Sequence, residues 1–138
     1  MIVLDASLMI AWLLREPELA PSSDLYFSLP QQMVVVPGHW PLEIGNALWA
    51  NVRRGRLPVD RLSVMMEELA TFEIQVQSAI QIEDMETLTR FAVAQNLTVH
   101  DSAYVHLAQR LGLPLATLDN AMRSAASALS IPLLPAAP

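Results

Sequence analysis

Apolar residues along this chain gather in five short runs, separated by segments in which they recur every three or four positions. The runs are rich in Ile, Val and Leu and cover residues 2–5, 33–36, 72–76, 115–118 and 131–134. Several are apolar at every position, which is typical of strands buried on both faces of a parallel sheet. The pattern therefore predicts five strands.

The segments between the strands have helical periodicity. Helices are expected at about residues 7–15, 22–29, 42–54, 61–69, 82–96, 101–111 and 120–129. Pro17 should stop the first helix and Gly55 should cap the end of the third, while Asp60 and Asp101 should begin the fourth and the sixth. Strands that alternate with helices predict an α/β fold, a three-layer domain with a central parallel sheet of about five strands flanked by helices.

Length and composition favour one domain over residues 1–138. The chain is 53% apolar and 16% charged, enough for a core of its own. Its apolar runs fall far short of the roughly 20 residues that cross a bilayer, and no export signal is evident at its start. Without cysteine it has neither disulfides nor thiolate metal ligands. We therefore expect a cytoplasmic protein.

Charge narrows the possible functions. Eight basic and fourteen acidic residues give a net charge of 8 − 14 = −6, which argues against broad nonspecific binding of phosphate. All eight basic residues are arginine. Without lysine, the chain cannot contain a phosphate-binding loop that ends in Gly-Lys-Ser/Thr.

Four acidic residues stand where an α/β sheet usually binds its ligand. Asp5 and Asp119 each end a predicted strand, and Glu43 and Asp101 lie near helix starts. Ligands of such sheets bind outside the carboxyl ends of the strands, so these four side chains could converge there. Asp101 also continues the apolar face of its helix with Tyr104, which indicates that it points inward.

Each acid has a simpler explanation when taken alone. Asp is a favoured N-cap residue, and Asp5, Asp101 and Asp119 all precede helical segments. Glu43 would suit a helix N-terminus through the macrodipole. However, no lysine is present to pair with four converging acids, so a cation from solution is the natural alternative. The three histidines do not form a zinc-protease motif and fit loop or surface positions.

Oxygen ligands alone select hard divalent ions, so Mg²⁺ or Mn²⁺ suits such a cluster better than zinc. The usual task of these ions is phosphoryl chemistry, in which an ion lowers the pKa of an attacking water and stabilises the leaving oxygen. The expected reaction is hydrolysis of a phosphodiester, leaving 5′-phosphate and 3′-hydroxyl ends. The positive charge that meets the phosphate would then come from the metal.

The motifs resemble those of PIN-domain ribonucleases, most closely the VapC toxins of toxin–antitoxin pairs. The resemblance covers nearly the whole chain and rests on four blocks in order: Val-Leu-Asp-Ala-Ser from residue 3, Glu-Ile-Gly-Asn-Ala-Leu from residue 43, His-Asp-Ser-Ala-Tyr-Val-His-Leu-Ala from residue 100 and Leu-Ala-Thr-Leu-Asp from residue 115.

The resemblance implies a role for each matching residue. Metal coordination and catalysis would fall to Asp5, Glu43, Asp101 and Asp119. Hydrogen-bond support would come from Ser7, Asn46 and Thr117. The resemblance also implies a homodimer, a cognate VapB-type antitoxin and an RNA substrate. Some members of the family carry a further acid shortly after the fourth, whereas Asn120 follows Asp119 here. The number of metal ions, one or two, therefore stays open.

Residues outside the acidic set give weaker signals. Arg15, Arg53 and Arg54 could contact an RNA backbone, although cations in a last helical turn are also favoured by the dipole. Trp12, Trp40, Trp49, Met65 and Met66 are mainly expected in the core. Because the chain is so apolar, some of these side chains should lie in a dimer or antitoxin interface. Residues 57–69 are the segment that we expect to contact the antitoxin.

Two other functions fit parts of the pattern. A receiver domain of a response regulator also has a five-stranded α/β fold with acids and a magnesium ion, but it expects a lysine that this chain lacks. A non-catalytic interaction module could keep the fold and only bind a partner, against which the complete set of four acids argues.

Overall fold

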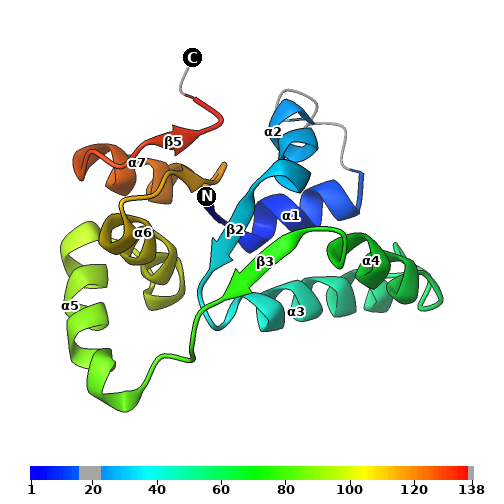
Figure 1. Ribbon diagram of the computed structural model, residues 1–138. Coiled ribbons are helices and arrows are strands. Elements are labelled where there is room, and N and C mark those ends of the chain that lie inside the picture. Colours follow the sequence, from blue (N-terminus) through cyan, green and yellow to red (C-terminus); the bar gives the residue numbers. More distant parts are fainter. Residues whose placement is uncertain (16–22, 137–138) are drawn as a thin grey trace.

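The computed structural model describes residues 1–15 and 23–136, and its five strands form one parallel sheet in the order β3-β2-β1-β4-β5 (Figure 1). The strands are β1 (Ile2–Leu4), β2 (Met33–Val36), β3 (Glu73–Val76), β4 (Leu115–Ala116) and β5 (Leu133–Leu134). Val3 of the central strand faces Val35 on one side and Leu115 on the other. The predicted parallel sheet is confirmed.

Helices cover both faces of this sheet, with α1, α3 and α4 on one side and α5, α6 and α7 on the other (Figure 1). The helices are α1 (Ala6–Leu13), α2 (Ser23–Ser28), α3 (Trp40–Arg53), α4 (Arg61–Leu69), α5 (Met85–Gln95), α6 (Val99–Leu111) and α7 (Asn120–Ala128). Two short 3₁₀ turns, η2 (Leu29–Gln31) and η3 (Ile82–Asp84), precede β2 and α5. The architecture is the three-layer α/β arrangement that the sequence predicts.

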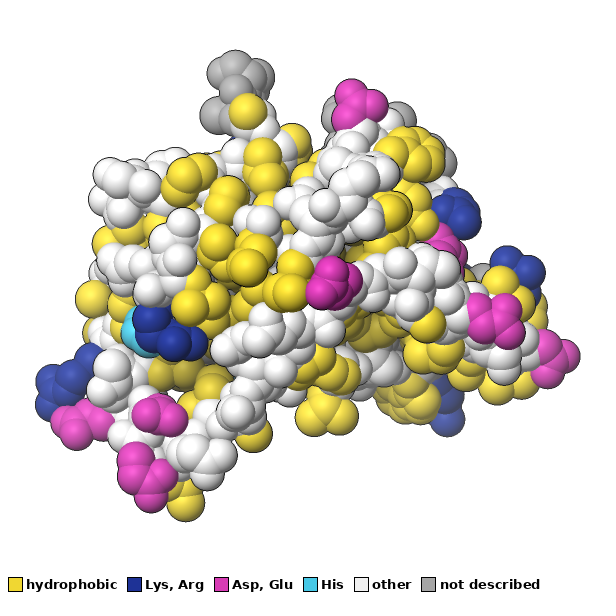
Figure 2. All heavy atoms as spheres, viewed as in Figure 1, with side chains coloured by type: hydrophobic (Ala, Val, Ile, Leu, Met, Phe, Trp, Pro, Cys, Tyr) yellow, Lys and Arg dark blue, Asp and Glu magenta, His cyan; other side chains and the backbone are white. Residues whose placement is uncertain are grey.

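The apolar runs are buried because the sheet is covered on both faces. All three residues of β1 are buried, and so are Val34, Val35 and Val36 of β2. Trp12, Trp40 and Met65 are buried as expected, whereas Trp49 and Met66 are 59% and 46% exposed. Charged side chains are sparse on the face shown in Figure 2, where apolar atoms form broad areas. None of the helices in the described ranges is both long and apolar enough to cross a membrane.

Several predicted helix boundaries need correction. Helix α6 begins at Val99, because the Thr98 hydroxyl accepts the N–H of Asp101 and caps it. Asp101 therefore lies in the first turn of α6. The prediction that Asp101 begins this helix is wrong. Asp60 precedes α4, but its side chain makes no cap hydrogen bond. Helix α1 ends at Leu13, and Pro17, the predicted stop, lies outside the described residues.

Gly38 connects β2 to α3 where another segment passes very close. A Cβ atom at this position would lie 3.0 Å from the Ala79 Cα and equally close to the carbonyl oxygens of Gln77 and Ser78. These neighbours are backbone atoms, which cannot rotate away as a side chain can. The contact therefore ties the segment after β3 to the carboxyl end of β2.

We predict that Gly38→Ala lowers the free energy of unfolding by about 1–3 kcal/mol, the usual cost of overpacking. Gly45→Ala in α3 is the matched control, since nothing lies within 4 Å of its Cβ position. That change should raise stability by about 0.5–1 kcal/mol, because alanine favours the helix. Urea unfolding measures both, and equal stability of the two variants would contradict the close approach at Gly38.

Candidate active site

Asp5 directly follows β1, and its buried carboxylate is held by three hydrogen bonds. The Thr117 hydroxyl and the Ser7 hydroxyl each donate to Asp5 Oδ2 over 2.7 Å. The Ser7 N–H donates to Oδ1 over 3.1 Å, so Asp5 also caps α1. Thr117 reaches Asp5 because β4, which it follows, is a direct neighbour of β1 in the sheet.

Asp119 is joined to the same hydroxyl. Its backbone N–H donates to Thr117 Oγ1 over 3.0 Å, and its Oδ1 accepts the N–H of Met122 over 2.8 Å at the start of α7. Arg123 then fixes the end of β4, because its guanidinium donates to the carbonyls of Thr117 and Pro135 at 2.8 and 2.9 Å. Thr117 thus sets the spacing between two acids on neighbouring strands.

Glu43 projects from the first turns of α3 and is held through one oxygen only. The Tyr104 hydroxyl donates to Oε1 over 3.0 Å and itself accepts the Ala6 N–H over 3.3 Å. His39 Nε2 lies 2.7 Å from the same Oε1, at ion-pair distance. The second oxygen, Oε2, accepts no hydrogen bond from the described residues and remains available to a ligand.

The acids influence one another's protonation. Burial raises the pKa of Asp5, and the charge of Glu43 raises it further against its hydrogen bonds. Burial also raises the pKa of Asp101, and the charges of Asp119 and Glu43 add to this effect. Burial acts to raise the pKa of Glu43 as well, but contacts with His39 and Tyr104 outweigh it and lower that pKa. Electrostatic effects therefore connect Glu43 with Asp5 and with Asp101, and Asp101 with Asp119.

No arginine neutralises this cluster in the described part of the chain. Arg15, one of the candidates for pairing with it, lies 3.3 Å from Glu68 Oε1 instead. Nor do any three acidic or histidine side chains, among residues 1–15 and 23–136, surround one point closely enough to hold an ion as they stand. The cluster is negative and close together, but it is not closed around a single position.

Sequence reasoning missed the aromatic residues beside Glu43. His39 packs edge-on against both His100 and Tyr104, with ring centroids 5.5 and 5.4 Å apart. The signal was present, because His39 stands four residues before Glu43 on one helical face. By contrast, Asn46 is exposed and donates no hydrogen bond to the four acids in the described residues, so its supporting role stays a prediction.

A model of the PIN domain family matches residues 2–128, a span that includes all four acids. The chain belongs to the PIN domain family. The resemblance seen in the sequence motifs is thereby confirmed. Within the described residues, the three-layer arrangement of one parallel sheet between helices is thus the fold of a PIN domain.

The chain is also similar to two curated proteins and to one solved structure. It is 37% identical over 90 residues to Ribonuclease VapC3 of Pyrobaculum aerophilum, covering 65% of this chain and 69% of that protein. It is 32% identical over 78 residues to Exonuclease VapC9 of the same organism, covering 56% and 55%. The crystal structure of PAE2754 from Pyrobaculum aerophilum shares the fold, with a TM-score of 0.68, 24% identity and coverage of 90% and 83%.

We predict that Thr117→Val destabilises the PIN domain by about 1–3 kcal/mol, because it removes one of the two hydroxyls that donate to buried Asp5 Oδ2 and leaves the Asp119 N–H without its partner. Thr117→Ser keeps the hydroxyl and should recover most of that loss. Thermal or urea unfolding of the two variants provides the comparison. If Val and Ser were equally stable at this position, the hydroxyl bridge would not contribute.

Proposed function

We propose that this PIN domain is a metal-dependent endoribonuclease that acts as the toxin of a toxin–antitoxin pair. The observation that carries the proposal is the set of four carboxylates at one sheet edge, which have no arginine partner among the described residues. Within this set the charge of Glu43 raises the pKa of Asp5, and the charges of Asp119 and Glu43 raise that of Asp101. Such a cluster attracts a cation. A relative named as a ribonuclease at 37% identity supports RNA as the substrate.

The donor set suits Mg²⁺ or Mn²⁺, because carboxylate oxygens are hard ligands. Asp5, Glu43, Asp101 and Asp119 would hold the ion. When bound, it would supply the positive charge that the phosphodiester needs and lower the pKa of a water molecule. The oxygens Glu43 Oε2 and Asp119 Oδ2 accept no hydrogen bond from the described residues, so they are the first that we assign to the ion.

Several of the residues that hold the acids in place are uncharged hydrogen-bond donors. Thr117 and Ser7 donate neutral hydroxyls to Asp5, and Tyr104 donates one to Glu43. Neutral donors fix a carboxylate without cancelling its charge, which keeps the cluster attractive to a cation. In our proposal Ser7 and Thr117 are therefore positioning residues.

Arginines are proposed to contact the RNA backbone. Arg53 and Arg54 are exposed at the end of α3, where the Arg53 guanidinium lies 5.7 Å from the centre of the Trp49 ring. Arg15 is exposed too, although it pairs with Glu68. Side chains of this kind position a nucleic acid without reading its sequence.

Partner binding is proposed at the exposed apolar side chains of residues 57–69. Val59, Val64 and Met66 are 62%, 44% and 46% exposed there, on and before α4. The relatives' names, VapC3 and VapC9, support a VapB-type antitoxin as the partner. A homodimer is also proposed, with the exposed Trp49 as one side chain that a second subunit could cover.

We predict that the purified protein cleaves RNA only when Mg²⁺ or Mn²⁺ is added, and that EDTA abolishes cleavage. Asp5→Asn and Asp101→Asn should each reduce the rate by about 100-fold or more, the scale seen when one essential catalytic group is removed. Asp60→Asn, an exposed acid at the start of α4, is the control and should keep full activity. Metal-independent cleavage would contradict the four-carboxylate site.

Endonuclease and exonuclease activity can be separated directly, which matters because one relative is named an exonuclease. A circular RNA has no ends, so it should be linearised by this protein if cleavage is internal. Failure on a circle, together with stepwise shortening of the linear form, would replace our endoribonuclease proposal with an exonuclease.

We expect expression of the chain in bacteria to arrest growth, and co-expression of the adjacent small gene to relieve the arrest. The Asp5→Asn protein should be harmless but should still bind the same partner. These results would separate a toxin from a housekeeping nuclease. If both wild type and Asp5→Asn bound a partner without any RNA cleavage, the non-catalytic interaction module would be favoured.

A further inference from the structure

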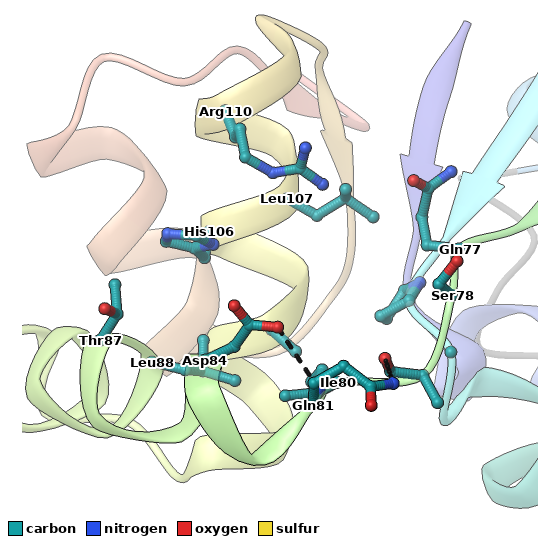
Figure 3. Close-up of a pocket in the computed structure, with 14 residues that line it drawn as sticks. Gln77, Ser78, Ile80, Gln81, Asp84, Thr87, Leu88, His106, Leu107 and Arg110 are labelled. Atoms are coloured by element: carbon teal, nitrogen blue, oxygen red, sulfur yellow. Dashed lines mark hydrogen bonds between the residues drawn. The ribbon is translucent and has the colours of Figure 1, made fainter.

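A cavity lies between the segment after β3 and the helices α5 and α6 (Figure 3). Its volume is about 490 Å³. Pockets of about 300–1,000 Å³ hold small organic groups. Its walls include the apolar side chains of Ile80, Leu88, Ala103 and Leu107. None of the four carboxylates lines it.

Polar groups stand around this apolar lining. Arg110 of α6 and Gln77 lie on opposite sides of the cavity (Figure 3). The carboxylate of Asp84, the last residue of η3, also lines it, and its Oδ2 accepts the Gln81 N–H over 3.4 Å. Arg110 and Asp84 form no ion pair in the described residues. The cavity therefore offers a guanidinium, an amide and a carboxylate to one occupant, with no net charge.

His106 adds an aromatic wall one helical turn before Arg110. Its ring packs edge-on against Phe91, with centroids 5.1 Å apart, which holds the imidazole in place. Burial lowers the pKa of His106, and the nearby Arg110 lowers it further. A lowered pKa favours the neutral imidazole, which suits stacking against a flat group better than binding an anion.

The cavity adjoins the acidic cluster along two segments of chain. Gly38 lines the cavity, and the next residue, His39, contacts Glu43. Ala103 lines it as well, and the next residue, Tyr104, donates its hydroxyl to Glu43. Two residues that line the cavity are thus the immediate chain neighbours of two residues that contact Glu43.

We propose that this cavity binds one unpaired nucleobase of the RNA substrate, next to the bond that is cut. A nucleobase is flat and apolar on its faces, and it carries hydrogen-bond donors and acceptors on its edges. Those are the features that His106, Leu107, Arg110, Gln77 and Asp84 match. A phosphate would instead meet the Asp84 carboxylate, which repels it. The proposal rests on the ribonuclease function proposed above.

Filling the cavity tests the proposal. Ser78→Trp places a large ring at its edge, and Arg110→Ala removes the guanidinium. Ser127→Trp on the exposed face of α7 and Arg90→Ala, whose guanidinium pairs with exposed Glu86, are the matched controls. All four changes are made in Asp5→Asn protein, and binding of fluorescein-labelled oligo(A), oligo(C) and oligo(U) is measured by anisotropy.

We expect Ser78→Trp and Arg110→Ala to raise the Kd of at least one oligomer about tenfold, the effect of losing one stacked base. The controls should stay within about twofold. An oligomer in which abasic residues replace the bases should bind the cavity variants and the controls equally. Photocrosslinks from 4-thiouridine in oligo(U) should map to residues 77–88 or 103–110.

Equal Kd values for Ser78→Trp and Ser127→Trp would overturn the proposal, as would crosslinks confined to other segments. Binding of AMP or UMP that is lost in Ser78→Trp, with no change for the oligomers, would overturn the assignment to the substrate RNA. A loss of antitoxin binding alone would overturn it in favour of a protein site. Because binding is read in Asp5→Asn protein, absent cleavage by the wild type would contradict only the proposed ribonuclease.

Discussion

The hydroxyl of Thr117 is the contact on which the candidate site depends. It donates to the carboxylate that ends β1 and accepts the backbone N–H of the acid that follows β4. The two acids follow strands that pair in the sheet, where the Asp5 N–H also donates to the Ala116 carbonyl. One buried hydroxyl therefore holds them at a fixed spacing while leaving their negative charge in place.

A neutral hydroxyl also holds Glu43, the acid on α3. Tyr104, fully buried in α6, donates to Glu43 of α3 and accepts from Ala6 of α1. One phenol thus connects three helices that begin at the same edge of the sheet. The contacts that reach Asp5 and Glu43 from other elements, those of Thr117 and Tyr104, come from neutral hydroxyls. The acids have no arginine partner in the described residues, which is consistent with the proposed cation site.

The sequence was enough to predict the sheet, because fully apolar runs have few alternatives to a buried parallel strand. It also indicated Asp5 and Asp119 at strand ends, since an acid directly after such a run must lie at the edge. It failed at Asp101, which was expected to begin α6, because Thr98 three residues earlier caps the helix better. Tyr104 could not be assigned, because its contact with Glu43 depends on how α3 and α6 pack, which no local pattern encodes. The contact of His39 with Glu43 is local, four residues apart, and was readable from the sequence but missed.

The position of β1 at the centre of the sheet has a consequence for how the molecule opens. Its residues are buried and paired on both sides, whereas β3 is an edge strand with mostly exposed residues. Local openings begin where few buried contacts oppose them. Amide hydrogens near β3 should therefore exchange with solvent long before those of β1. The proposed nucleobase cavity beside β3 and the acids beside β1 then lie in regions that differ in local stability. The protein can open locally around a bound RNA while the acids beside β1 stay in place.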